Sequence, residues 1–187
     1  MTVKECYDIF LRHIDRATSG GKALEDRKKE DFKDKFLHLL NPALEYICSI
    51  MNPVKKFNFT LEDGSYSIRL PDDFYKIIRV RFNGEIYTDY YMVENVMYSK
   101  SGNGFYEIVY SYISKLPGDI NDNDVIDIPR RCEMLLPLKI ASDCIKTEDS
   151  ALSAYLMNIF NSEIENLCRE KGFFDNFKGL QRLFSID

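Results

Sequence analysis

The chain of 187 residues has the size of one domain, or of one domain with an appendage, and it is long enough to bury a core without disulfides or bound metal. Hydrophobic residues make up 45% and charged residues 29%, a composition that excludes an intrinsically disordered chain. The net charge of −5 argues against a protein that coats DNA, because binding many phosphates requires clustered Lys and Arg. No apolar run approaches the ~18 residues of a membrane-spanning helix, so no membrane partner is expected.

The N-terminal residues predict a helix that starts at a capping box. Thr2 and Glu5 occupy the two positions of that motif, and the run Ser19-Gly20-Gly21 ends the helix. Its expected buried side consists of apolar residues at helical spacing, namely Val3, Cys6, Tyr7, Phe10, Ile14 and Ala17.

A second helical region spans residues 24–51, and Pro42 interrupts it. Either this helix continues with a kink, or Asn41 caps a new helix with Pro42 at its first position. The apolar side keeps its phase across the proline, which favours the kinked helix. That side consists of Phe32, Phe36, Leu39, Leu40, Ala43, Leu44, Ile47, Cys48 and Met51.

The pattern then changes from helical spacing to alternation, which predicts strands. Residues 57–61 and 66–70 alternate on either side of a turn at Gly64, which predicts an antiparallel hairpin. The Asn83-Gly84 pair is a strong type I′ turn signal for a second hairpin.

That second hairpin joins residues 77–82 to residues 85–88. Residues 89–98 are predicted as a short helix or an irregular segment. Residues 105–113 are predicted as the longest strand. One face of it should carry Tyr106, Ile108, Tyr110 and Tyr112.

Residues 129–172 predict two helices joined by a short turn. Asp149 and Ser150 are N-cap types for the second helix, and Gly172 stands where a C′ glycine ends a helix. Pro137 is expected to cost the first helix one hydrogen bond and to kink it. The expected core positions are Leu135, Leu138, Ile140, Ala141, Cys144, Ile145, Leu152, Tyr155, Leu156, Ile159, Phe160, Ile164, Leu167 and Cys168.

We therefore expect an α+β fold that is mainly α. Helices from residues 1–52 and 128–172 would form a helical bundle core, and residues 53–127 would be a β-rich insertion of antiparallel hairpins. Residues 1–172 would be a single domain, followed by an extended C-terminal tail of residues 173–187.

No residue pattern predicts a metal, a cofactor or a catalytic site. Residues 119–124 match the first oxygen ligands of a calcium loop, but Asp124 replaces its glycine and Arg130 stands in place of its bidentate Glu. His13 and His38 each stand alone on a helix. The cysteines, which form no CxxC pair, are expected to be buried small hydrophobes; they are Cys6, Cys48, Cys132, Cys144 and Cys168.

Four short stretches define the layout of the chain: Leu70-Pro71-Asp72-Asp73-Phe74, residues 77–80, residues 106–112, and Ile128-Pro129 before the helical pair. In this layout, residues 1–172 resemble the head–tail adaptor (connector) proteins of tailed bacteriophages. The nearest likeness is to the adaptor ring directly under the portal of short-tailed phages. Such proteins have a helical core with a β-rich insertion, assemble as rings, commonly of twelve subunits, and extend a C-terminal segment onto the portal.

The resemblance implies a structural virion protein, not an enzyme, that joins portal to tail at the head–tail junction and resides in the bacterial host cytoplasm before assembly. Its partners would be the portal, the downstream tail proteins and further copies of itself. DNA would pass through the ring without specific binding, which suits an acidic chain. The alternatives are a bacterial or prophage-encoded binding or regulatory module without catalytic activity, and an enzyme whose site is built from scattered residues.

The C-terminal residues after Gly172 are rich in large apolar side chains, which need a surface to pack on. That surface belongs either to this chain or to a neighbouring protein, and the sequence leaves both open. By the resemblance, the segment would dock on the portal through Phe173, Phe174, Phe177, Leu180, Leu183 and Phe184.

Overall fold

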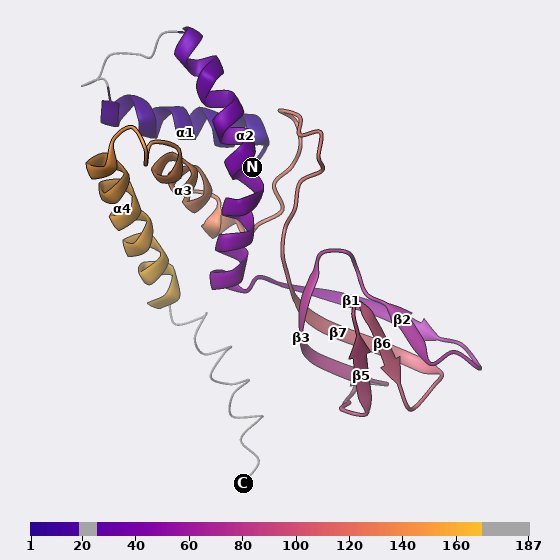
Figure 1. Ribbon diagram of the computed structural model, residues 1–187. Coiled ribbons are helices and arrows are strands. Elements are labelled where there is room, and N and C mark those ends of the chain that lie inside the picture. The colour runs from indigo at the N-terminus through magenta and orange to yellow at the C-terminus, as the bar shows by residue number, and fades with distance from the viewer. Residues whose placement is uncertain (19–25, 170–187) are drawn as a thin grey trace. The chain divides into compact units, whose positions relative to one another are not determined.

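The computed structural model describes residues 1–18 and 26–169, in which the chain forms helices and two antiparallel sheets (Figure 1). The helices are α1 (Val3–Thr18), α2 (Asp26–Met51), α3 (Leu135–Cys144) and α4 (Ser150–Arg169), with a 3-10 turn, η1 (Arg130–Cys132), before α3. The strands are β1 (Val54–Leu61), β2 (Ser67–Arg69), β3 (Phe74–Phe82), β4 (Glu85–Ile86), β5 (Tyr90–Val93), β6 (Val96–Ser99) and β7 (Gly104–Tyr112).

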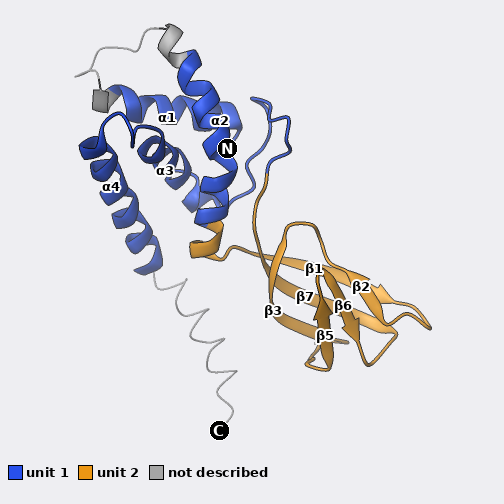
Figure 2. Ribbon diagram, in the orientation of Figure 1, with its two compact units in different colours: residues 1–47, 116–187 blue, residues 48–115 orange. Residues whose placement is uncertain are grey.

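The chain separates into two compact units (Figure 2). The helical unit consists of the described residues of Met1–Ile47 and Leu116–Asp187. The sandwich unit is Cys48–Lys115, which contains both sheets. None of the described helices is long and apolar enough to cross a lipid bilayer.

The expected mainly α fold with a helical bundle core is wrong. The part of the chain that the structure describes is α+β, 44% helical and 26% strand, with two antiparallel sheets. The strands bury a cluster of their own, which includes Met97, Tyr106 and Ile108 at 0% exposure, so they do not depend on the helices for a core. In the helical unit, α1 lies across α2, whereas bundle helices run nearly parallel (Figure 1).

The ends of the helices follow local sequence signals. The capping box is confirmed, because the Thr2 N–H donates to Glu5 Oε2 at 2.8 Å and the Glu5 N–H donates to Thr2 Oγ1 at 3.2 Å. Asp149 caps α4, since its carboxylate accepts the Leu152 N–H at 2.9 Å.

Of the two predictions for prolines inside helices, the one for Pro42 is confirmed and the one for Pro137 is not. The prediction of one helix through Pro42 is confirmed by α2, and Asn41 uses its side chain to bond the backbone of Leu116 instead of capping a new helix. The prediction that Pro137 costs a hydrogen bond is wrong. Pro137 is the third residue of α3, where backbone N–H groups have no acceptor within the helix.

The core of the helical unit forms where α3 packs against both α1 and α4. Nine of the ten residues of α3 are buried, so this helix lies inside the unit. Phe10 and Phe36 pack together with ring centroids 5.3 Å apart, and both side chains are fully buried. Leu156 and Phe160 of α4 are buried as well, as their spacing predicted. The prediction for Tyr155 is wrong, because this side chain is 61% exposed on the outer side of α4.

The sandwich unit has a four-stranded sheet in the order β1-β7-β3-β4 and a three-stranded sheet in the order β2-β6-β5. The predicted hairpin about Gly64 is wrong, because β1 pairs with β7 and β2 pairs with β6. The predicted hairpin at Asn83-Gly84 is confirmed, with φ of 48° and 90° at the two turn residues. Residues 89–98 form neither a helix nor an irregular segment, since most of them belong to the β5–β6 pair.

The predicted inner face of β7 is confirmed. Tyr106, Ile108, Tyr110 and Tyr112 are all buried, and they pack with Met97 of the three-stranded sheet in one hydrophobic cluster. A chain of hydroxyl groups also joins the two sheets at this level.

In that chain, Ser99 Oγ lies 2.6 Å from the Tyr106 hydroxyl and 2.8 Å from the Tyr87 hydroxyl. The Tyr106 hydroxyl donates to the Gly102 carbonyl at 2.9 Å, so these buried hydroxyl groups are satisfied.

Candidate functional site

The residues expected to dock on a portal lie outside the described residues. They are Phe173, Phe174, Phe177, Leu180, Leu183 and Phe184. The candidate sites among the described residues lie in the two compact units.

The acidic turn at residues 119–124 contacts the start of α1. The Asp124 carbonyl accepts the Val3 N–H at 3.0 Å, and the Asp122 carbonyl accepts the Lys4 N–H at 2.9 Å. The Asp124 carboxylate accepts the Asn121 N–H, and the Asp122 carboxylate pairs with Lys33. Asp122 and Asp124 are thus engaged within the protein, and this turn helps to hold the start of α1.

The cysteines and histidines do not gather into a metal site. Among the described residues, no group of three His, Cys, Asp or Glu side chains could hold a metal ion. The predicted burial is confirmed for Cys6, Cys48, Cys132 and Cys144, whereas Cys168 is half-buried.

Burial also controls the acidity of two thiols. It raises the pKa of Cys6 to about 12 and that of Cys144 to about 11, so neither thiol is a nucleophile at neutral pH.

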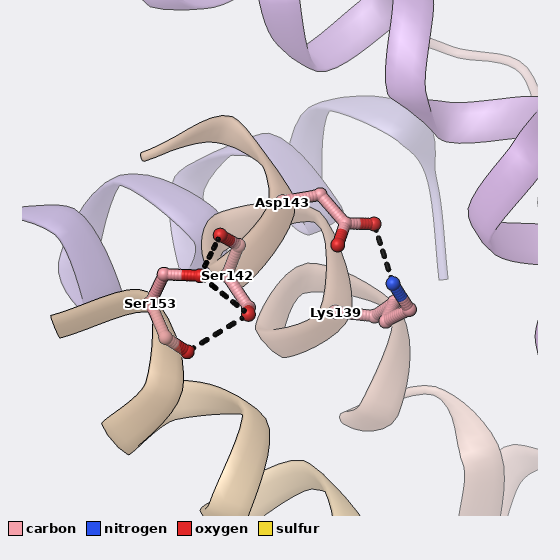
Figure 3. A network of polar contacts seen from close by, with 4 residues as sticks. All are labelled: Lys139, Ser142, Asp143 and Ser153. Carbon is pink, nitrogen blue, oxygen red and sulfur yellow. Dashed lines mark hydrogen bonds and ion pairs between the residues drawn. The ribbon is translucent and has the colours of Figure 1, made fainter. Parts of the chain in front are cut away.

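A polar network between α3 and α4 brings together serine and lysine side chains (Figure 3). The Ser142 hydroxyl donates to the Ser153 carbonyl at 3.0 Å, and the Ser153 hydroxyl donates to the Ser142 carbonyl at 2.9 Å. Lys139 instead pairs with Asp143 at 2.5 Å and lies 5.0 Å from the centre of the Tyr46 ring. A serine nucleophile needs a base within hydrogen-bond reach. The hydroxyl groups of Ser142 and Ser153 instead donate to backbone carbonyls, so their contacts link α3 to α4.

An open groove of about 230 Å³ lies between α1, α3 and α4 in the helical unit. Leu135, Leu138 and Ile159 give it an apolar lining, and Arg131 and Glu163 add one charge of each sign. His13, one of the two histidines that the sequence places alone on a helix, also lines it. The groove is suited to an apolar side chain.

One outer surface of the sandwich unit is apolar and aromatic. Met97 points into the core, so its neighbours on β6 and the matching residues on β5 point outward. We call this surface the tyrosine face; it consists of Tyr91, Val93, Val96 and Tyr98. The rings of Tyr91 and Tyr98 stack with centroids 5.0 Å apart, and Tyr91 and Val93 are more than half exposed.

The opposite outer surface, on the four-stranded sheet, is basic. Residues of β7 that alternate with the buried tyrosines point outward, and their partners on β1 and β3 share that side. We call it the basic face; its cations are Lys56, Lys76, Arg79 and Arg81. Lys56 and Arg79 flank Val109 of β7, Arg81 lies opposite Glu107, and Lys76 lies opposite Ser111.

Neither of these faces was predicted from the sequence. The tyrosine face lies on residues 89–98, which were not predicted as strands. The basic face depends on strand order, because Lys56 and Arg79 are far apart in sequence and meet only across β7. Alternation within β1 and β7 was the available signal.

Neither the scan against protein-family models nor the search of curated proteins found a match for this chain.

Proposed function

We propose that this protein is a structural virion subunit, without enzymatic activity, that joins portal to tail as a member of a ring around the DNA channel. The observation that carries the proposal is the exposed apolar surface of the sandwich unit. Of the eleven exposed large hydrophobic side chains among the described residues, seven belong to this unit: Val54, Tyr66, Tyr75, Ile86, Tyr91, Val93 and Phe105. Of these, Tyr91 and Val93 lie together on the tyrosine face, and adjoining exposed apolar side chains support a role in protein contacts.

The strand edges of the sandwich unit support the same role. In the three-stranded sheet, β2 and β5 are edge strands, and in the four-stranded sheet β1 is an edge strand of eight residues. Edge strands present unpaired N–H and C=O groups that another chain can cover. In a ring, each subunit contacts the next through two different surfaces, so one copy's tyrosine face would pack on a different surface of its neighbour.

The partners in this proposal are further copies of the chain, the portal and the downstream tail proteins, and the location is the head–tail junction of the virion, with the host cytoplasm before assembly. The proposal assigns portal docking to Phe173, Phe174, Phe177, Leu180, Leu183 and Phe184. The hydroxyl groups of Ser142 and Ser153 donate to backbone carbonyls, which supports a protein without a serine nucleophile.

The test mixes the purified chain with a candidate portal protein and images the mixture by negative-stain electron microscopy. We expect rings stacked on the portal. Amide hydrogen exchange in residues 53–113 should slow on assembly, because neighbours would cover the strand edges.

A Tyr91→Ser/Tyr98→Ser variant should fold but fail to form rings. The control is Tyr155→Ser, which removes an equally exposed tyrosine from α4. Absence of portal binding by the wild-type chain would favour the alternative of a binding or regulatory module. Ring formation by the Tyr91→Ser/Tyr98→Ser variant would show that the tyrosine face is not the contact.

A further inference from the structure

The basic face carries more positive charge than its own carboxylate can balance. Glu107 is the one carboxylate that register places among the four cations. It accepts a hydrogen bond from Lys56 Nζ at 2.8 Å and lies 3.9 Å from Arg81 Nη1. The hydrogen bond from Lys56, with the positive charges of Arg81 and Arg79, lowers the pKa of Glu107, which keeps it ionised. One negative charge among Lys56, Lys76, Arg79 and Arg81 leaves an excess of three positive charges.

These cations are accessible to a partner. The side chain of Lys56 is 61% exposed and that of Arg81 is 40% exposed. Lys76 is exposed as well, whereas Arg79 is half-buried. Within the described residues, neither Lys76 nor Arg79 forms an ion pair. The face therefore offers cations to solvent within a chain whose net charge is −5.

The spacing of the cations follows from the sheet. Arg79 and Arg81 are two residues apart on one strand, which separates their Cα atoms by about 6.6 Å. Lys56 lies two strand spacings from Arg79, a distance of about 9.5 Å. A patch of this size matches several phosphates, since duplex DNA carries one negative charge per ~1.7 Å of its axis.

The chemistry of the face favours phosphate over an acidic protein surface. Guanidinium groups bind phosphate oxygens in a bidentate manner, and Asn58 beside Glu107 adds an exposed amide. Protein interfaces are centred on large buried apolar anchors, whereas the residue between Lys56 and Arg79 on this face is the small side chain Val109. A flat sheet face that does not enter a groove meets the DNA backbone and does not read bases.

We propose that the basic face binds the phosphate backbone of duplex DNA without reading its sequence. The proposal does not rest on the connector role, because a single subunit would bind DNA in the same way. In a ring, however, it would assign to the four-stranded sheet the surface that meets DNA.

The test measures binding of the full chain to a short labelled duplex by fluorescence anisotropy over a range of salt concentrations. With three to four phosphate contacts, the affinity should fall roughly 40- to 150-fold between about 50 and 200 mM salt. A Lys56→Gln/Arg79→Gln/Arg81→Gln variant should bind at least about tenfold more weakly, with a salt dependence reduced by about one phosphate contact per cation removed.

The matched control is Lys100→Gln/Lys115→Gln/Lys146→Gln, which removes the same charge from exposed lysines outside the basic face. It should bind like the wild-type chain. If both triple variants lose affinity equally, binding follows net charge and the proposal is overturned. The proposal is also overturned if the wild-type chain does not bind the duplex at low salt, or if polyglutamate displaces the duplex at equal charge concentration.

A second variant tests the proposal even if the triple variant fails to fold. Asn58→Glu adds a carboxylate to the basic face at an exposed position and keeps every cation. It should weaken DNA binding several-fold, whereas Ser67→Glu, an exposed change on the three-stranded sheet, should not. Unchanged binding by a folded Asn58→Glu variant would overturn the assignment of this face.

Discussion

Ser142 and Ser153 each donate a side-chain hydrogen bond to the backbone carbonyl of the other, at 3.0 Å and 2.9 Å (Figure 3). Both residues are buried at the junction of α3 and α4. Ser142 is among the last four residues of α3, whose carbonyl groups have no N–H partner within the helix. The Ser153 hydroxyl therefore satisfies a carbonyl oxygen that the helix itself leaves without a donor.

We expect Ser153→Ala to lower the free energy of unfolding by about 1–3 kcal/mol, because it leaves the buried Ser142 carbonyl without a donor. Ser142→Ala should cost less, about 1 kcal/mol, because the Ser153 carbonyl lies inside α4, where the helix supplies an N–H. Urea denaturation followed by circular dichroism measures both. Ser162→Ala, at an exposed position of α4, is the control and should have little effect.

Leu156 is 3% exposed on α4, and it tests the core of the helical unit. Leu156→Asp buries an unpaired charge, which costs several kcal/mol and is comparable with the whole stability of a domain of roughly 5–15 kcal/mol. We expect a chain without a cooperative thermal transition of the helical unit. Tyr155→Asp places the same charge on a side chain that is 61% exposed and should leave the transition in place. A Leu156→Asp variant that is soluble and melts cooperatively would contradict the described core.

Gly104 begins β7 with φ of +148°, and a Cβ atom added there would lie 2.3 Å from Cε2 of Phe82. Gly104→Ala must displace the Phe82 ring from its contact with Tyr106, where the ring centroids are 4.8 Å apart. Backbone strain and overpacking together should cost about 1–3 kcal/mol in the free energy of unfolding. Gly118→Ala, with open space around the added atom, is the control in the same denaturation experiment. Equal stability of the two variants would contradict the described packing of Phe82.

Local sequence signals predicted the parts of this fold that depend on neighbouring residues. The capping box at Thr2 and Glu5, the turn at Asn83-Gly84 and the buried face of β7 are all set within a few residues of sequence. The pairing of β1 with β7 was not predictable in this way, because it joins segments more than forty residues apart. The turn at Gly64 exists, but it leads from one sheet to the other.

The four cations of the basic face could not be grouped from the alternation of residues in the sequence. Strict alternation would place Lys76 on the side opposite Arg79 and Arg81. The register of β3 shifts between Ile77 and Arg79, which is the mark of a β-bulge, and the shift brings Lys76 onto the same side as both arginines. A bulge inserts one residue without a sequence signature strong enough to predict, so the four cations could not be grouped from the sequence.

The buried thiols predict a dependence of stability on alkaline pH. Burial raises the pKa of Cys6 from its ordinary value of 9.0 to about 12, and that of Cys144 to about 11. Below pH 9 both thiols are protonated in the folded and unfolded states. Above it, the unfolded chain releases protons that the folded chain retains, so stability should fall as pH rises through the window up to about 11–12.

We expect a loss of roughly 1 kcal/mol per buried thiol for each pH unit within this window. Denaturant midpoints measured across it test the sign, and a Cys6→Ala/Cys144→Ala variant should show a weaker dependence. At pH 8, a thiol-reactive dye should label half-buried Cys168 first. Labelling of Cys6 in the native state as fast as that of Cys168 would contradict the described burial.

The last prediction concerns residues 173–187, which would either dock on a portal or pack on their own domain. In the described residues, the last buried side chain of α4 is Phe160, so the helical core does not use the end of this helix. Burying three large aromatic side chains on a partner could contribute about 5–8 kcal/mol before ordering costs are subtracted. The groove that includes Leu167 offers an alternative surface on the same chain.

A chain truncated after Gly172 separates these outcomes. We expect it to fold with a melting curve close to that of the full chain, because it retains every buried residue of the described core, and to lose binding to the portal. Melting is followed by circular dichroism, and portal binding by cosedimentation. The matched control is a full-length chain with Asp175→Ala, which alters a charge of the segment and keeps Phe173, Phe174 and Phe177. If the truncated chain binds the portal as well as the full chain, the segment is not the anchor; if it cannot fold, the segment belongs to the core of its own domain.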